Sequence, residues 1–329
     1  MERVHALLKM NEMQKEMPNK MRVAILDDYQ SCVHTLNAYK LIQNLEVIIF
    51  HDTVRDEDLL EERLKDFQVL VVIRERTPLP ARLLERLPKL RLISAAGSFP
   101  NCIDRDACSR LGIATEDGSG VGAPTAELCW ALILASRRNL AQEAGALRSG
   151  LWQQSLGRSL RGQKLGIWGY GRVGRQVARY GQVFGMEVCV WGSDRARAQA
   201  RADGHAPYGS RLELFSESDV LSLHLKLVAD TVGAVTPADL AAMKTDALLV
   251  NTARAELIAP GALAAALGHG RPGFAAVDVF ESEPAGAASS ALIELPNVLA
   301  TPHIGFVERE NYEAYYQAAF SHVLRFLEG

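Results

Sequence analysis

The stretch Lys164-Leu-Gly-Ile-Trp-Gly-Tyr-Gly-Arg-Val-Gly174 predicts the fold of this chain. Its apolar start indicates the end of a buried strand, its Gly-Tyr-Gly centre a tight turn, and Arg172 the beginning of a helix. Residues 185–192 then supply the second strand of a βαβ unit. The glycines form the pattern G-x-G-x-x-G, which in this context is the fingerprint of a dinucleotide-binding fold.

Each glycine has its own role in such a fold. Gly169 makes the turn, Gly171 lets the backbone approach a pyrophosphate, and Gly174 lets the helix pack closely on the strand. The helix N-terminus offers unpaired N–H groups and a positive dipole end to the phosphates. The alternative is a plain strand-to-helix connection. A P-loop is set aside because no Gly-Lys-Ser/Thr ends the motif.

Composition and charge point to a globular protein with small ligands. The length of 329 residues allows two domains, and 48% apolar with 23% charged residues is a globular composition. A formal charge of −3 gives no electrostatic case for nucleic acid or an anionic membrane. No apolar run reaches the roughly 18 residues of a spanning helix. We therefore expect neither nucleic acid nor a membrane as a partner.

Five scattered cysteines form no C-x-x-C pair and no cluster with metal spacing. We expect each to be a buried, reduced thiol, with no metal site and a cytoplasmic location. Residues 1–20 are charged and Met-rich without an apolar segment, so they do not resemble a signal peptide. They are either a frayed helix or an alternative start ahead of Met21.

Apolar strands alternating with helices predict two parallel sheets covered on both faces, an α/β fold. A Gly-rich break at residues 118–122 predicts the crossing into the second domain and a hinge, and residues 142–152 predict a helix that opens into an arm. Trp152 is expected in the core or at a subunit contact. The expected strands are residues 23–26, 47–50, 69–73, 90–95, 165–168, 185–192, 220–223, 247–250, 273–277 and 298–300. The expected helices are residues 58–64, 124–137, 172–184, 237–243, 260–267 and 307–327.

Ligand-binding loops follow the carboxyl ends of strands in such sheets. In the first half, Arg74 and Arg76 follow one strand and residues 97–101 follow the next. A guanidinium binds carboxylate or phosphate through a bidentate fork, so either arginine is a candidate anion site. Solvent-exposed loop arginines are the alternative.

In the second half, three expected strands are each followed by a polar residue whose side chain could take part in catalysis. These are Arg254, Glu283 and His303. A set of this kind suits hydride transfer between a nicotinamide and an α-hydroxy acid. Arg254 would clamp the carboxylate and polarise the carbonyl, His303 would act as acid and base, and Glu283 would orient the imidazole. Asp278 could accept from the carboxamide of the nicotinamide. Taken singly, each could equally be a helix cap, a surface ion pair or a core residue.

The motifs G-Y-G-R-V-G, N-T-A-R-A-E-L-I, D-V-F-E-S-E-P and T-P-H-I-G, in this order, resemble those of the D-isomer-specific 2-hydroxyacid dehydrogenases. Phosphoglycerate dehydrogenase and glyoxylate/hydroxypyruvate reductase belong to that family. The resemblance runs from about Met21 to the end and implies that Arg254, Glu283 and His303 are catalytic. It also implies two Rossmann-like domains, with a nucleotide-binding domain (119–301) inserted into a flavodoxin-like substrate domain (21–118 and 302–329), and a homodimer formed through the nucleotide-binding domain.

The same resemblance gives the expected ligand contacts. NAD is the expected cofactor, with NADP left open. Substrate contacts are expected at Arg74, Arg76, Gly97, Ser98, Arg254 and His303. Cofactor contacts are expected at Gly169, Tyr170, Gly171, Arg172, Val173, Gly174, Trp191, Gly192, Ser193, Asp194, His224, Lys226, Thr252, Ala253, Arg254, Asp278, His303 and Gly305.

The chain departs from the family pattern at several of these positions. Gly192 stands where members that prefer NAD usually carry an acid, and such an acid binds the ribose hydroxyls. Lys226 replaces a proline, Ala255 replaces a glycine, and residues 97–101 lack the usual G-x-G. Glu283 disfavours a formate dehydrogenase, which has glutamine there.

We therefore predict an NAD(P)-dependent oxidoreductase of the phosphoglycerate dehydrogenase type that acts on a small D-2-hydroxy acid or its 2-keto partner. A glyoxylate/hydroxypyruvate reductase is the alternative within the family. A non-enzymatic NAD(H)-sensing protein, like the C-terminal-binding corepressors, is the alternative from another class, because fold alone does not fix function.

Overall fold

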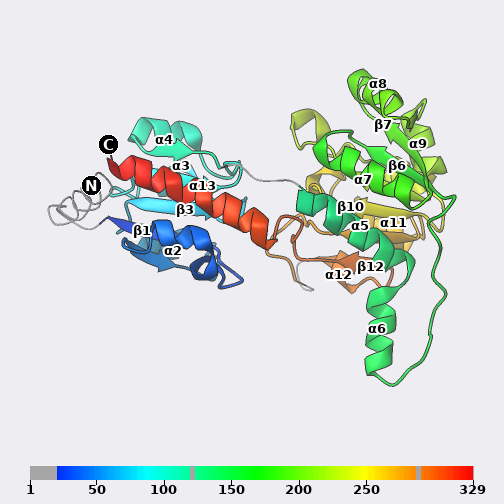
Figure 1. The fold of residues 1–329 in the computed structure, drawn as a ribbon, viewed down its shortest axis with the longest axis horizontal. Helices are drawn as coiled ribbons and strands as arrows, with labels where there is room; N and C mark the ends of the chain where they lie inside the picture. Colours follow the sequence, from blue (N-terminus) through cyan, green and yellow to red (C-terminus); the bar gives the residue numbers. More distant parts are fainter. Residues whose placement is uncertain (1–20, 119–122, 287–289, 329) are drawn as a thin grey trace, which may run out of the picture. The chain divides into compact units, whose positions relative to one another are not determined.

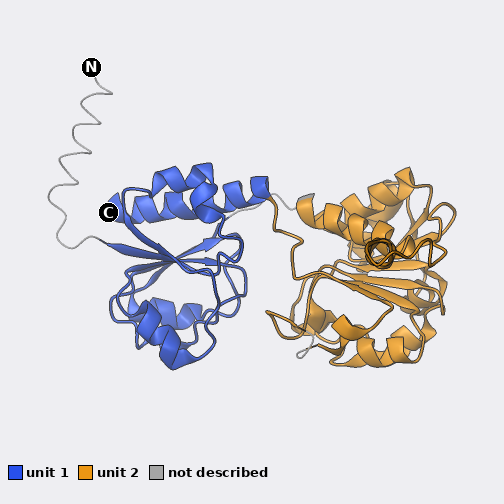
Figure 2. Cartoon of the chain, turned by 90° about the horizontal axis from the view of Figure 1, so that it is seen from below, with its two compact units in different colours: residues 1–121, 309–329 blue, residues 122–308 orange. Residues whose placement is uncertain are grey.

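The computed structural model describes residues 21–118, 123–286 and 290–328 of the chain. The expectations for residues 1–20, and for the part of the Gly-rich break at 119–122, lie outside these ranges. The chain divides into two compact units (Figure 2). Unit 1 comprises residues 1–121 and 309–329, and unit 2 comprises residues 122–308. The predicted domain boundaries lay at 118/119 and 301/302.

Unit 1 is built on a five-stranded parallel sheet in the order β2-β1-β3-β4-β5. The long C-terminal helix α13 packs on β4 (Figure 1). The Ser94 hydroxyl donates to the carbonyl of Ala319 at 3.0 Å. The α/β prediction is thus confirmed for this unit. Its elements are β1 (Arg22–Ile25), β2 (Glu46–Ile49), α2 (Glu57–Leu64), β3 (Val69–Ile73), α3 (Ala81–Leu84), β4 (Leu92–Ala96), α4 (Arg105–Leu111), β5 (Ala114–Glu116) and α13 (Arg309–Glu328).

Unit 2 is built on a seven-stranded parallel sheet in the order β12-β11-β10-β9-β6-β7-β8. The strands are β6 (Lys164–Trp168), β7 (Glu187–Trp191), β8 (Ala206–Pro207), β9 (Val220–Leu223), β10 (Leu248–Asn251), β11 (Phe274–Val277) and β12 (Val298–Ala300). The helices are α5 (Ala123–Arg137), α6 (Leu140–Arg148), α7 (Arg172–Val183), α8 (Asp194–Ala202), α9 (Arg211–Glu217), α10 (Pro237–Ala242), α11 (Ala262–Gly268) and α12 (Ala291–Glu294).

The two faces of this sheet bury two separate apolar layers, as the twofold period of a strand requires. Along β9, Val220 joins the layer with α5 and α7, whereas Leu221 joins the layer with α9, α10 and α11. Strands buried on both faces read as continuous apolar runs, which is why the sequence predicted them well.

The order of the strands reverses at β6, which has β7 on one side and β9 on the other. The chain runs outward from β6 through β7 to β8 and then returns to the opposite side at β9. Ligands of open α/β sheets bind at such a switch point, beyond the carboxyl ends of the strands. The glycine motif follows β6 directly, so the fold places it at this point.

The three motif glycines meet different surroundings. Gly169 has φ +98°, and a Cβ on it would lie 2.6 Å from the carbonyl oxygen of His224. A Cβ on Gly174 would lie 2.1 Å from the carbonyl oxygen of Gly169, whereas one on Gly171 would meet nothing within 4 Å. Gly169 and Gly174 are therefore required by the fold itself, while the space beside Gly171 is open.

Three expectations need correction. Helix α6 ends at Arg148 instead of continuing to Trp152, because the chain turns through Gly150 at φ +79°. Trp152 is 72% exposed, so its expected place in the core is wrong. All five cysteines are free, but Cys32 and Cys102 are only half-buried. None of the helices within the described residues combines the length and the apolar character needed to cross a bilayer.

We predict that Gly174→Ala destabilises the protein by about 1–3 kcal/mol, because the new methyl group overlaps a backbone carbonyl that cannot move freely. Gly171→Ala is the matched control, since it adds the same methyl group to open space. Urea unfolding followed by circular dichroism measures both. Equal stability of the two variants would contradict the assigned packing role of Gly174.

Candidate active site

Three neighbouring strands deliver the candidate catalytic residues to one edge of the unit 2 sheet. Asn251 at the end of β10 pairs with Val277 at the end of β11, and Val277 pairs with Ala300 at the end of β12. The strands are parallel, so the loops that carry Arg254, Glu283 and His303 all begin at the carboxyl edge. The glycine motif after β6 begins at the same edge.

His303 and Glu283 are in direct contact. The imidazole Nδ1 lies 2.6 Å from Oε2 of Glu283, and both side chains are mostly buried, with exposed fractions of 20% and 34%. A carboxylate only accepts hydrogen bonds, so Nδ1 carries the hydrogen and Nε2 is left for another partner. The edge of the imidazole also packs at 85° to the ring of Phe306. The ring is therefore fixed in both orientation and tautomer.

The charge of Arg254 acts on the Glu283–His303 pair. Burial acts to raise the pKa of Glu283, but the hydrogen bond from His303, the charge of His303 and the charge of Arg254 outweigh it. The pKa of Glu283 consequently lies below its ordinary value, and the carboxylate stays ionised. A guanidinium, a carboxylate and an imidazole thus act on one another within unit 2.

Arg254 is held by the loop that carries it. Its Nη1 donates to the carbonyl of Ala253 at 2.7 Å. The Asn251 side chain closes the loop, because its amide donates to the carbonyl of Arg254 at 2.8 Å and its oxygen accepts from the N–H of Ala253 at 3.0 Å. Sequence analysis overlooked this role of Asn251, although an Asn at a strand end often forms such a turn.

Asp278 fixes the loop that carries His303. Its carboxylate accepts from the hydroxyl of Thr301 at 2.6 Å and from the N–H groups of Ile304 and Gly305, each at 2.8 Å. Burial raises the pKa of Asp278 in spite of these bonds. The sequence-based hypothesis assigned Asp278 to the nicotinamide, but in the structure its bonds go to the His303 loop. The part played by Thr301 was not anticipated.

At the glycine loop the backbone N–H groups are uncapped, and the side chain of Tyr170 bonds elsewhere. Helix α7 begins after Gly171, and no side chain caps its N–H groups. Tyr170 is buried, and its hydroxyl donates to Asp203 at 3.0 Å. That bond and burial raise the pKa of Tyr170 well above its ordinary range. A cofactor contact at Tyr170 would therefore be made by its backbone. Arg172 and Val173 form the first turn of α7.

The end of β7 differs from a typical NAD ribose site. Gly192 brings no side chain to this position, and a Cβ there would come within 3.3 Å of the Cβ of Ala196. Ser193 caps α8 by accepting from Ala196 N–H at 3.3 Å. The exposed Asp194 pairs with Arg197, whose guanidinium lies 4.7 Å from the ring centre of Trp191.

His224 and Thr252 lie at the ends of β9 and β10, and Lys226 is an exposed residue two positions beyond His224. His224 Nε2 lies 2.9 Å from the hydroxyl of Ser222. Burial lowers the pKa of His224 to about 4, so its ring is neutral near pH 7. The Thr252 side chain is 5% exposed, and its hydroxyl faces the thiol of Cys129.

The expected substrate contacts of unit 1 follow β3 and β4. Arg76 donates from Nη1 to the carbonyl of Asp27 at 2.7 Å, and its guanidinium lies 4.3 Å from the ring centre of Tyr29. Arg74 has φ +55°, and Gly97 has φ +101°. A Cβ on Gly97 would touch the ring of Tyr315 at 3.3 Å. Ser98 is exposed beside it.

The chain is similar to known proteins over most of its length. Residues 130–305 match the family described as D-isomer specific 2-hydroxyacid dehydrogenase, NAD binding domain. A crystal structure of a phosphoglycerate oxidoreductase from Vibrio cholerae is 48% identical, with a TM-score of 0.92 and coverage of 94% of this chain and 99% of that one. A glyoxylate reductase from Aeropyrum pernix is 37% identical over 258 residues, 75% of this chain and 76% of that protein.

A D-3-phosphoglycerate dehydrogenase from Methanocaldococcus jannaschii is 34% identical over 283 residues. The match covers 84% of this chain and 53% of that protein, so the chain spans about half the length of this relative. Among the residues that the structure describes, no group of three or more His, Cys, Asp or Glu side chains could hold a metal ion.

We predict that Glu283 contributes to stability in a pH-dependent way. Because its pKa is lowered on folding, it stabilises the fold above the ordinary value of 4.5 and loses that contribution as the pH falls through the lowered value. In Glu283→Gln the free energy of unfolding should lie below that of the wild type at neutral pH, and the difference should shrink on acidification. Urea unfolding between pH 3 and pH 7 measures this difference. Glu294→Gln on α12 is the control. If the difference in unfolding free energy between Glu283→Gln and the wild type is the same at every pH, the prediction is contradicted.

Proposed function

The chain belongs to the D-isomer-specific 2-hydroxyacid dehydrogenase family, and from this membership we propose that Arg254, Glu283 and His303 catalyse hydride transfer between NAD(H) and a small D-2-hydroxy acid. The family makes the chain an NAD(P)-dependent oxidoreductase of 2-hydroxy and 2-keto acids. The observation that carries the residue assignment is the 2.6 Å contact between Glu283 and His303, beside the charge of Arg254.

His303 moves the proton in this proposal. Its Nε2 donates a proton to the carbonyl oxygen of a keto acid and takes it back when a hydroxy acid is oxidised. Glu283 accepts the hydrogen bond from Nδ1–H, so Nε2 is the nitrogen that exchanges the proton with the substrate. The Asp278 carboxylate positions the loop that carries the imidazole. The bound nicotinamide supplies or accepts the hydride.

Arg254 binds the carboxylate of the acid and polarises the carbonyl that is reduced. A guanidinium suits this role because its planar fork matches a carboxylate and stays charged at every working pH. In unit 1, Arg74, Arg76, Gly97 and Ser98 are proposed to contact the rest of the substrate. The two arginines favour substrates that carry a second anionic group, as 3-phosphoglycerate does, over glyoxylate.

The residues around the glycine loop fit a dinucleotide. The open space beside Gly171 admits the pyrophosphate, and the uncapped N-terminus of α7 offers it N–H groups. Thr252, directly after β10, is a further proposed contact at this edge of the sheet. Gly192 and Ser193 bring no carboxylate to the ribose, so use of NADP is a specific alternative to be measured along with NAD.

A homodimer through unit 2 is part of the proposal. The arm formed by α6 and the chain that follows it exposes Leu147, Leu151, Trp152 and Leu156, the last with an exposed fraction of 96% (Figure 1). Contiguous exposed apolar side chains of this kind mark protein interfaces.

The free thiols of all five cysteines suit a cytoplasmic location.

The proposal is tested by nicotinamide absorbance at 340 nm on a panel of acids: the keto acids are assayed with NADH and NADPH, and 3-phosphoglycerate, a hydroxy acid, is assayed with NAD⁺ and NADP⁺. Hydroxypyruvate, glyoxylate, 3-phosphoglycerate and a branched keto acid separate the possible substrates. Turnover with at least one member is the expected result. An intact, cofactor-binding protein without turnover on any member would instead support the NAD(H)-sensing alternative.

We predict different kinetic defects for the two cationic residues. His303→Ala should lower kcat by about 10²–10⁴, the usual contribution of a general acid, while NADH affinity changes little. Arg254→Ala should raise the KM for the keto acid as well as lower kcat. Steady-state kinetics and NADH fluorescence titration give the three quantities. Mild and equal effects in both variants would mean that the residues are structural.

We predict that Gly171→Ala weakens NADH binding at least tenfold without loss of stability. The added methyl group meets no protein atom within 4 Å and so lies in the space that the pyrophosphate needs. The control is Gly268→Ala at the end of α11, where a Cβ also meets nothing. Fluorescence titration with NADH measures the affinity of both variants. Identical affinities would contradict the placement of the pyrophosphate beside Gly171.

A further inference from the structure

A hollow of about 440 Å³ lies at the amino edge of the unit 2 sheet, opposite the edge that carries the glycine loop. Its lining residues precede strands β6 and β7 or lie at the end of α5. Four of them are arginines, Arg137, Arg138, Arg158 and Arg161. No aspartate or glutamate among the described residues lines the hollow.

Arg137 is the buried member of this group. Its exposed fraction is 5%, and its Nη1 donates to the carbonyl of Asp246 at 2.8 Å. Its Nη2 donates to the carbonyl of Asp219, while Nε is buried without a hydrogen-bond partner among the described residues. Burial, together with the like charge of Arg158, lowers the pKa of Arg137 to about 10. The hydrogen bonds of this buried guanidinium thus go to backbone carbonyls, and the charges of Asp219 and Asp246 attract it as well.

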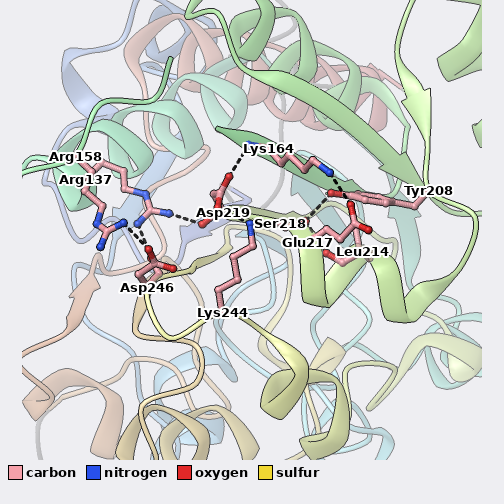
Figure 3. Close-up of polar contacts among 10 residues, drawn as sticks. All are labelled: Arg137, Arg158, Lys164, Tyr208, Leu214, Glu217, Ser218, Asp219, Lys244 and Asp246. Carbon is pink, nitrogen blue, oxygen red and sulfur yellow. Dashed lines mark hydrogen bonds and ion pairs between the residues drawn. The ribbon is translucent and has the colours of Figure 1, made fainter. Parts of the chain in front are cut away.

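The nearby carboxylates are committed to other cations (Figure 3). Asp246 pairs with Arg158, and this pair touches the edge of the hollow. Asp219 accepts from Nζ of Lys244 at 2.6 Å and from the N–H of Lys164 at 2.8 Å. Lys164 itself pairs with Glu217. Asp246 therefore neutralises Arg158, and the positive charge that remains in the hollow belongs to the other three arginines.

Arg138 and Arg161 are exposed on the wall of the hollow. Neither makes an ion pair with any residue that the structure describes. The two segments that supply the arginines, residues 137–138 and 158–161, are brought together by backbone contact, since Arg158 N–H donates to the carbonyl of Arg137 at 2.7 Å. Arginines from separate parts of the chain therefore line one hollow.

We propose that this hollow binds a small phosphoryl anion at a site separate from the dinucleotide site. Several guanidinium groups on different walls suit the tetrahedral oxygens of a phosphoryl group, whereas one planar carboxylate is satisfied by a single guanidinium fork. The volume exceeds the need of one phosphate, and Leu134 and Phe184 give the remainder apolar walls. A five-residue strand, β6, separates the two edges, a distance on the order of 15 Å.

Such a ligand would bridge Arg138 at the end of α5 and Arg161 just before β6, and so fasten the base of the arm formed by α6 and the chain that follows it. Binding to the folded state alone raises stability in proportion to the logarithm of ligand concentration. The site is thus an effector site that acts on the arm. It goes beyond the proposed catalytic function and does not depend on it.

The test is isothermal titration of the full chain with pyrophosphate at constant ionic strength and with NADH present to occupy the glycine loop. Binding with a submillimolar Kd and a raised unfolding temperature is expected. Inorganic phosphate should bind more weakly, and malonate, a carboxylate of similar charge, should not compete. Absence of pyrophosphate binding, or equal binding of malonate, overturns the proposal.

Matched variants locate the binding. Arg138→Ala/Arg161→Ala should weaken pyrophosphate binding at least tenfold and leave NADH affinity unchanged. Arg110→Ala/Arg325→Ala removes two exposed arginines of unit 1 and should change nothing. Retained binding in the first variant, or equal loss in the second, overturns the proposal. Light scattering identifies the oligomer, and a dimer that excludes pyrophosphate because a second copy fills the hollow overturns it too.

Discussion

The buried carboxylate of Asp278 is the constraint on which the candidate site depends. It accepts three hydrogen bonds, one from Thr301 and one each from the N–H groups of Ile304 and Gly305. These bonds fix the loop on either side of His303, whose backbone has φ +51°. Burial makes a carboxylate costly unless it is fully bonded, so the loop has little freedom to adopt another path. The imidazole is consequently presented to Glu283 in one orientation.

The parallel sheet converts separations in sequence into proximity in space. Arg254, Glu283 and His303 lie 20 or more residues apart, but each follows a strand whose neighbours end at the same edge. The change of strand order at β6 places the open backbone of Gly171 at this edge as well. A nucleotide loop and an acid–base pair are therefore consequences of one topology, while the arginine hollow belongs to the opposite edge.

The sequence predicted this edge because buried strands and glycine turns leave strong local patterns. The strands around Leu249 and Ala276 are apolar on both faces. The match of residues 130–305 to the family confirmed the enzyme class that the motifs predicted. The hydrogen-bond partners and the exposure of side chains depend on tertiary structure, so they could not be predicted from the sequence. Nothing local indicates that Tyr170 turns toward Asp203, that Asp278 bonds to the His303 loop, or that Trp152 is exposed. Those depend on contacts between segments distant in the sequence.

The most direct test of the central claim is a crystal structure with NADH and oxamate, an unreactive analogue of a 2-keto acid. The account predicts that the oxamate carboxylate lies within hydrogen-bond distance of the Arg254 guanidinium, that its carbonyl oxygen lies within reach of His303 Nε2, and that Glu283 keeps its bond to Nδ1. Oxamate bound away from His303, or an imidazole released from Glu283 when both ligands are present, would contradict the claim that these three residues form one catalytic unit.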